Sequence, residues 1–323
     1  MKIQKLFWTL MVAVLPLGFA ACSSDDDGGS SQDTTPYVYK APVNKANAGK
    51  WEMNNGGYVN LDASNTVTLR LPRINEELGV KASATRGQDI SALFDYIVGE
   101  YKKNGDLIEI YVGGQLWGTV KIVPNGNGKF TVVIQPKNSE PIEDEASKKE
   151  PVASSSETEK LCRTWKPYEI RINVLKPGAT SWIGRKAIPD FDDVKKKAEE
   201  EGCHVDDDFG KGYAIERISF DDCGSFTIGF DKKKNPDAKD YVGSWRWEKE
   251  KEGLLHYDWA DDNKGKENSF ATGEAQIEHK VGEFKGQCWL HLKGDIEDKN
   301  EHKIYKVDLI VCMYDPNDPD VKI

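Results

Sequence analysis

Histidine and cysteine are scarce in this sequence, and the short motifs that identify many enzymes are missing. The 323 residues include five histidines and six cysteines, with no C-x-x-C pair, no G-x-S-x-G or H-E-x-x-H motif and no nucleotide-binding glycine loop. The acid pairs Asp207-Asp208 and Asp221-Asp222 are adjacent, so on an extended strand they point to opposite faces and make a poor glycosidase pair. The sequence therefore predicts a protein that is not an enzyme, with no cofactor and no metal site.

Positive charge and long apolar runs are also lacking. The net charge is −10, and it becomes −12 if Lys2 and Lys5 are removed with a leader. An acidic chain is a poor partner for nucleic acid and for anionic lipid. The apolar run from Leu6 to Leu17 is too short for a membrane-spanning helix, which needs about 20 apolar residues.

The N-terminal residues have the pattern of a secretory signal peptide. Two lysines precede the apolar run, and small residues and a polar stretch follow it. The segment Leu17-Gly18-Phe19-Ala20-Ala21-Cys22 resembles the lipobox of bacterial lipoproteins, which implies cleavage before Cys22 and acylation of its thiol. We therefore expect residues 1–21 to be a lipoprotein signal peptide and Cys22 to hold the protein on a lipid bilayer through several acyl chains. The alternative is ordinary cleavage that leaves a free cysteine.

The residues after Cys22 suggest where the protein works. The acidic run Asp25 to Asp27 resembles the export signal of surface lipoproteins in the Bacteroidota. This resemblance implies an outer-membrane protein, lipid-anchored and facing the cell exterior. The alternative is a solvated acidic tether, and in both cases residues 22–35 are expected to be disordered.

The rest of the chain divides into two domains joined by a flexible linker at residues 137–160, which contains no aromatic residue. The first domain, residues 36–136, is predicted to be a small α+β domain with a mostly antiparallel sheet. Its one covering helix begins at the N-cap Asp89, because the following apolar residues are spaced like one helical face. Those residues are Ile90, Leu93, Phe94, Ile97, Val98 and Tyr101.

The second domain, residues 161–316, alternates apolar and polar residues in eight segments. Short gaps with Gly, Asn or Asp separate most neighbours, so the segments are predicted to pair as antiparallel hairpins and close into an eight-stranded barrel. A helical insertion is expected from Phe191 to Glu201, capped by Asp190. The eight segments centre on residues 168–174, 214–220, 226–230, 245–247, 255–259, 275–277, 288–292 and 305–311.

Short blocks of the second domain resemble lipocalin-like domains of Bacteroidota lipoproteins. Leu161-Cys162-Arg163-Thr164-Trp165 stands where lipocalins have G-x-W, with Arg163 in place of the glycine. The blocks Ile218 to Phe226 and Gly243 to Trp247 continue the pattern. The resemblance implies a lipocalin-like barrel, with Trp165 at its closed end. Gly49-Lys50-Trp51 also matches G-x-W, but too few strands are predicted after it for a barrel, so we interpret it as a coincidence.

The remaining cysteines leave two interpretations open. An odd number in an oxidising compartment predicts at least one unpaired thiol, alongside either one or two disulfides or only buried thiols. The five residues are Cys162, Cys203, Cys223, Cys288 and Cys312.

Aromatic residues of the second domain are the predicted ligand-binding residues. An eight-stranded barrel is either filled by side chains or encloses one small cavity. In a hollow barrel, aromatic residues would line a site for a small apolar or glycan-type ligand. In a filled barrel they would form the core of a structural, adhesion or protein-interaction lipoprotein. The candidates are Trp165, Trp245, Trp247, Tyr257 and Trp259.

Overall fold

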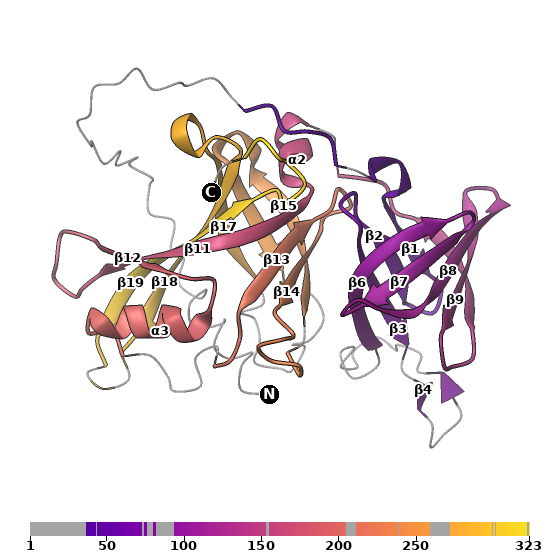
Figure 1. Cartoon of the computed structure of the whole chain (residues 1–323), viewed down its shortest axis with the longest axis horizontal. Helices are drawn as coiled ribbons and strands as arrows, with labels where there is room; N and C mark the ends of the chain where they lie inside the picture. The colour runs from indigo at the N-terminus through magenta and orange to yellow at the C-terminus, as the bar shows by residue number, and fades with distance from the viewer. Residues whose placement is uncertain are drawn as a thin grey trace.

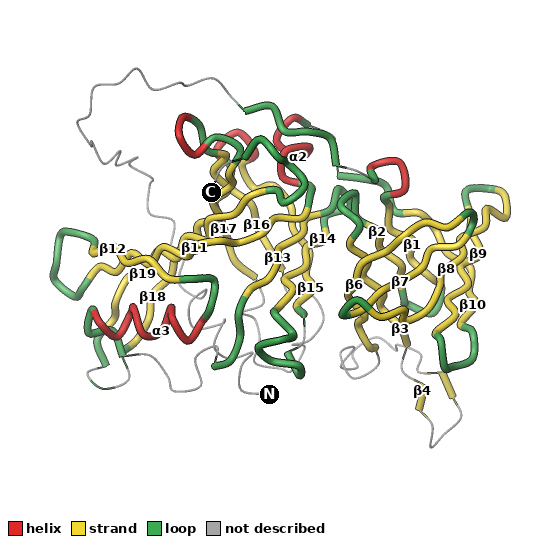
Figure 2. The backbone as a smooth tube through the Cα atoms, in the orientation of Figure 1, coloured by secondary structure: helices red, strands yellow, loops and turns green. Residues whose placement is uncertain are grey.

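A computed structural model describes residues 37–42, 44–72, 74–75, 80–81, 94–152, 155–204, 211–238, 240–258, 272–298, 300, 302–321 and 323. Over this part of the chain the protein is mainly β and forms two closed antiparallel barrels of eight strands that lie side by side (Figure 1). Helices are few and short (Figure 2). The predicted signal peptide, Cys22 and the tether lie outside the described residues. None of the described helices has both the length and the apolar character needed to cross a bilayer.

The first barrel follows a short 3-10 helix, η1 (Lys45–Asn47), and winds up and down in chain order. Its last strand pairs with its first, with Trp51 opposite Lys148, and this pairing closes the barrel. A two-stranded ribbon, β4 (Ile74–Asn75) and β5 (Val80–Lys81), extends the connection between its third and fourth strands. The eight strands are β1 (Gly49–Met53), β2 (Tyr58–Leu61), β3 (Thr66–Pro72), β6 (Phe94–Asn104), β7 (Leu107–Val112), β8 (Gln115–Gly126), β9 (Lys129–Pro136) and β10 (Ile142–Lys148).

The prediction of an α+β domain with a covering helix was wrong, because the expected helix is strand β6. Ile97 pairs with Leu69 of β3, and Tyr101 pairs with Ile110 of β7. Ile97 and Tyr101 are four positions apart, a spacing that places two residues on one face of a helix and equally on one face of a strand. Tertiary pairing on both sides of β6 decides for the strand. Asp89, Ile90 and Leu93 lie outside the described residues.

The prediction of a flexible linker at residues 137–160 was wrong. The segment contains the strand β10 and most of the helix α2 (Ser156–Leu161). β10 completes the first barrel between β9 and β1. Only Ile142 and the fully buried Ala146 supply apolar packing from this strand, and most of its other residues are charged. A barrel strand needs apolar residues only on the face that points inward, and the other face can be charged. The short, mostly charged β10 therefore has a composition similar to that of a flexible linker.

The second barrel confirms the predicted eight-stranded antiparallel barrel with a helical insertion. Its first and last strands pair along most of their length, and an additional strand, β12 (Ile183–Ala187), pairs with the other edge of the first strand. The insertion contains α3 (Phe191–Glu200), capped by Asp190. The barrel strands are β11 (Thr164–Leu175), β13 (Ile215–Phe220), β14 (Ser225–Phe230), β15 (Tyr241–Lys249), β16 (Leu254–Asp258), β17 (Thr272–His279), β18 (Gln287–Glu297) and β19 (Ile304–Tyr314).

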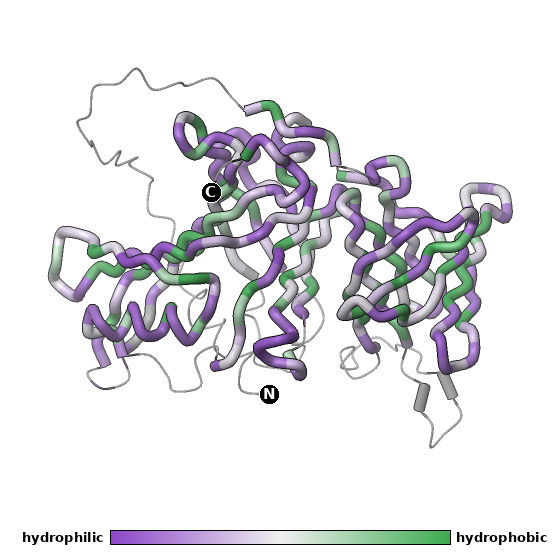
Figure 3. The backbone as a smooth tube through the Cα atoms, viewed as in Figure 1, coloured by the Kyte–Doolittle hydropathy of each residue, from purple (hydrophilic) through white to green (hydrophobic). Residues whose placement is uncertain are grey.

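Each barrel has its own apolar core, and hydropathy alternates along many of the strands that surround it (Figure 3). A β-bulge in β11, between Pro167 and Glu169, shifts the alternation. As a result Tyr168 packs in a separate cluster with Trp289, whereas Ile170, Ile172 and Val174 face the barrel core. Tyr168 and Ile170 are two positions apart in a segment predicted to alternate, where both would lie on one face, but the bulge places them on different faces.

The five described cysteines are free, buried thiols. The structure therefore supports the interpretation of buried thiols and contains no disulfide among its described residues. Burial raises the pKa of Cys203, Cys223 and Cys312 to about 12 in each case, which keeps these thiols protonated at neutral pH.

Candidate binding site

The two barrels carry the same hairpin in the same place. β2–β3 and β13–β14 each join the second and third strands of their barrel, and their turns begin at Asp62 and Asp221. The Oδ1 atom of each aspartate accepts the backbone N–H groups two and four residues further on, over 2.7 to 2.9 Å. Gly49-Lys50-Trp51 stands at the start of β1, and Arg163-Thr164-Trp165 stands in the same way at the start of β11, whose first residue is Thr164. The premise of the coincidence interpretation, that too few strands follow Gly49-Lys50-Trp51 for a barrel, was therefore wrong.

These hairpins face each other in a polar seam between the barrels. The hydroxyls of the equivalent residues Thr68 and Thr227 lie 3.3 Å apart. Each aspartate also accepts a hydrogen bond from the opposite barrel: Asn60 Nδ2 to Asp221 Oδ2 at 2.5 Å, and Thr164 Oγ1 to Asp62 Oδ2 at 3.3 Å. The contacts of Thr164 with Thr66 (3.1 Å) and of Lys50 with Ser225 (3.3 Å) join equivalent positions of the two barrels, which is typical of a two-fold, isologous interface. The barrels therefore pack as two similar halves.

Burial sets the electrostatics of the seam. It raises the pKa of Asp62 to about 6, although hydrogen bonds from the backbone N–H groups of the same turn act to lower this pKa. Burial also raises the pKa of Asp221, and it lowers that of Lys50 beside it. The Nζ atom of Lys50 lies 3.3 Å from the hydroxyl of Ser225. The seam thus holds two buried carboxyl groups for which the protonated state is favoured by desolvation.

Residues 37–42, here called the strap, cross the end of the second barrel. The hydroxyl of Tyr37 donates to Asp318 Oδ2 over 2.8 Å, and that of Tyr39 donates to the carbonyl of Gln287 over 3.1 Å. The ring of Tyr39 packs edge-on against Trp165, with centroids 5.7 Å apart. These contacts fix the strap on the second barrel before the chain enters the first.

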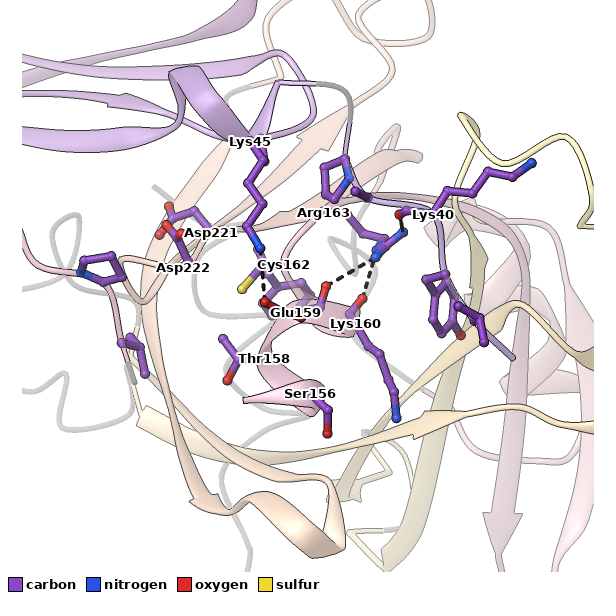
Figure 4. A pocket seen from close by; sticks show the side chains of 18 of the residues that line it. Lys40, Lys45, Ser156, Thr158, Glu159, Lys160, Cys162, Arg163, Asp221 and Asp222 are labelled. Atoms are coloured by element: carbon purple, nitrogen blue, oxygen red, sulfur yellow. Dashed lines mark hydrogen bonds and ion pairs between the residues drawn. The ribbon is translucent and has the colours of Figure 1, made fainter. Parts of the chain in front are cut away.

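A pocket of about 400 Å³ lies between the strap, helix α2 and the turn after β13, and we call it the strap pocket. Figure 4 shows Lys45 and Glu159 joined across it, with their charged atoms 3.1 Å apart. The guanidinium of Arg163 donates to the carbonyls of Glu159 and Lys40. The pocket's lining also includes Tyr37, Tyr39, Val38, Pro42, Val152 and Phe220.

The strap pocket is lined by one thiol and three carboxyl groups among its described residues. The thiol is that of Cys162, and burial raises its pKa well above the ordinary value, so the reactive thiolate is disfavoured. The carboxyl groups are those of Glu159, which is paired with Lys45, and of Asp221 and Asp222.

The structure places the predicted aromatic residues inside the second barrel or against its end. Trp165, Trp245 and Tyr257 are buried in its core. The indole N–H of Trp165 donates to Leu161 and that of Trp245 to Asp221, both at backbone carbonyls. The half-buried Trp247 packs against the same core, and its indole N–H donates to Thr158 of α2. Trp259 lies outside the described residues.

Sequence reasoning missed the strap pocket. Its tyrosines, Tyr37 and Tyr39, directly follow the predicted tether and are separated by one residue, the spacing of an extended segment that presents one face. That spacing was the available signal. The contacts with the end of the chain, such as the bond from Tyr37 to Asp318, join positions 281 residues apart and leave no local pattern.

The described residues contain no group of three or more histidine, cysteine, aspartate or glutamate side chains arranged to hold a metal ion. Comparisons of the chain with protein-family models, with curated proteins and with solved structures find no match.

Proposed function

We propose that this protein is a non-catalytic lipoprotein of the outer membrane, anchored through an acylated Cys22 and facing the cell exterior. We further propose that it captures a small apolar or glycan-type ligand in the strap pocket. The signal-like N-terminus and the acidic run after Cys22 support the location. The lipocalin-like blocks of the second barrel support a binding role. The observation that carries the ligand assignment is the strap pocket itself.

The size and lining of the strap pocket favour a small, uncharged ligand. Its volume of about 400 Å³ lies in the range of small-molecule sites, and it combines tyrosine rings with a few polar groups. Its charged side chains are largely neutralised: Lys45 pairs with Glu159, and Lys40 pairs with Asp320 over 2.7 Å. Tyrosine rings offer apolar faces to a sugar ring, and the remaining polar groups can bond its hydroxyls.

A second candidate function follows from the interior of the second barrel. Trp165, Trp245 and Tyr257 belong to one continuous core, so this interior is occupied by side chains. A filled barrel favours a structural, adhesion or protein-interaction lipoprotein without a small-molecule site.

Saturation-transfer NMR with maltose, cellobiose and diacetylchitobiose distinguishes the two candidates. The test variant is Ala41→Trp, which places a large side chain among the residues that line the strap pocket. The control is Ala179→Trp in an exposed loop of the second barrel. We expect at least one sugar to receive saturation from the native protein and from the control but not from Ala41→Trp.

Two results would overturn the glycan assignment. One is the absence of transfer to every sugar, which supports the protein-interaction candidate. The other is unchanged transfer in Ala41→Trp, which excludes the strap pocket as the site.

A further inference from the structure

The end of the first barrel beside η1 has a second pocket, separate from the strap pocket and independent of the function proposed for it. This basal pocket has a volume of about 460 Å³ and lies beside η1, where several strands of the barrel begin or end. Its lining includes Trp51, Tyr101, Lys103, Lys121, Phe130 and Lys148.

The second barrel shows how such an end is closed by protein alone. There, α2 precedes the first strand, and the indole N–H of Trp165 donates to the carbonyl of Leu161 at the end of α2 over 2.9 Å. Arg163 lies over the ring of Trp165, with 5.6 Å between the guanidinium carbon and the ring centroid. Because the β2–β3 and β13–β14 hairpins have the same geometry, this end of the second barrel corresponds to the end of the first barrel that holds the basal pocket.

The first barrel has the same tryptophan but a smaller cap. Trp51 is buried, and its indole nitrogen has no hydrogen-bond partner among the described residues. The preceding element is only the three-residue η1. A buried N–H group without an acceptor is costly, and native proteins seldom leave one. The end of this barrel therefore lacks an acceptor that its counterpart possesses.

The basal pocket is also positively charged. Three lysines line it, against a single acidic residue, Asp106. Lys103 donates to the side chain of Asn47, whereas Lys121 and Lys148 have no ion-pair partner in the part of the chain that the structure describes. The ammonium of Lys148 lies 5.2 Å from the centroid of the Trp51 ring. The excess of positive charge points to a negatively charged occupant.

We propose that the basal pocket binds a small organic anion with an apolar or aromatic body. The ammonium groups of Lys121 and Lys148 hold its carboxylate or sulfonate. The body of the ligand packs against Phe130, Ile108 and the other apolar residues of the lining.

The probe for this proposal is anilinonaphthalene sulfonate, whose fluorescence rises in an apolar site, and the neutral phenylnaphthylamine is its uncharged counterpart. The protein is the full chain with Cys22→Ala, so that neither lipid nor detergent competes for the dye. The test variant is Lys121→Gln/Lys148→Gln, and the control is Lys137→Gln, an exposed lysine in the β9–β10 turn.

We expect one saturable site for the sulfonate and weaker binding of the neutral dye. The double variant should bind the sulfonate about fivefold more weakly, the combined effect of two exposed charges, with little change for the neutral dye. The Lys137→Gln control should bind both dyes as the native protein does.

Unchanged sulfonate affinity in the double variant would overturn the site, and so would equal affinity for the two dyes. Loss of sulfonate binding in Ala41→Trp would also overturn it, since the probe would then occupy the strap pocket.

Discussion

Replacing Asp62 in the seam with asparagine should stabilise the folded protein at neutral pH but not at about pH 4. Asp62→Asn keeps an Oδ1 atom that can accept the two backbone N–H groups of the turn. The new amide can donate to the hydroxyl of Thr164, which lies 3.3 Å from Oδ2 in the native protein. The substitution therefore retains the hydrogen-bond pattern and removes only the buried charge.

The size of the effect follows from the raised pKa. The carboxyl of Asp62 has an ordinary pKa of 3.8, and burial raises the pKa to about 6 in the folded protein. Each unit by which the folded pKa exceeds the unfolded pKa corresponds to about 1.36 kcal/mol. Ionisation of Asp62 therefore destabilises the folded state by up to about 3 kcal/mol. Because the folded pKa is the higher one, this stability is present at low pH and is lost as the pH rises from about 4 through 6.

Urea unfolding of the native protein and of Asp62→Asn at about pH 4 and pH 7 tests this reasoning. We expect Asp62→Asn to be more stable by up to about 3 kcal/mol at pH 7 and to be close to the native protein at pH 4. Asp106→Asn, which removes an exposed carboxylate from the same barrel, is the control and should have little effect at either pH. A loss of stability in Asp62→Asn at pH 7, or an equal gain at both pH values, would refute the account of the seam.

Three further predictions concern the strap, the thiols and the anchor. Tyr39→Ala should lower the free energy of unfolding by about 2 kcal/mol, because it removes a ring packed on Trp165, whereas Val38→Ala, at an exposed position, should leave it unchanged in the same urea assay. N-ethylmaleimide should label Cys162 slowly until the protein unfolds, because the thiol is buried and protonated, and rapid labelling measured by mass spectrometry would contradict this. Cys22→Ala should move the protein from the membrane to the soluble fraction, and in intact cells protease should digest the native protein; survival until lysis would exclude surface exposure.

The second barrel could be predicted from the sequence because its strands alternate clearly and are joined by short turns. Each strand, from the one that contains Ile170 to the one that contains Val311, lies near its predicted position. The first barrel could not be predicted in this way. In β6 the apolar residues fit a helix as well as a strand, and β10 carries few apolar residues. Each of these strands pairs with a sequence neighbour and also with a distant strand, β3 for β6 and β1 for β10, and no local pattern records the distant pairing.

The candidate site shows a similar division. The sequence predicted that the aromatic residues of the second barrel would gather, and Trp165, Trp245 and Tyr257 do share one core. The strap pocket brings residues 37–45 together with α2 and with residues 220–222, and the strap itself is fixed by distant contacts such as that of Tyr37 with Asp318. Its existence depends on how the closed barrel packs against the strap, so it became visible only in three dimensions.

The central claim is that the ligand is held outside the barrels, at the strap. A crystal structure of the protein soaked with the sugar that gives the strongest saturation transfer tests this most directly. The account predicts the sugar between Tyr37, Lys45 and α2, with the core around Trp245 unchanged. A sugar within the second barrel, beside Trp245 and Tyr257, would contradict it.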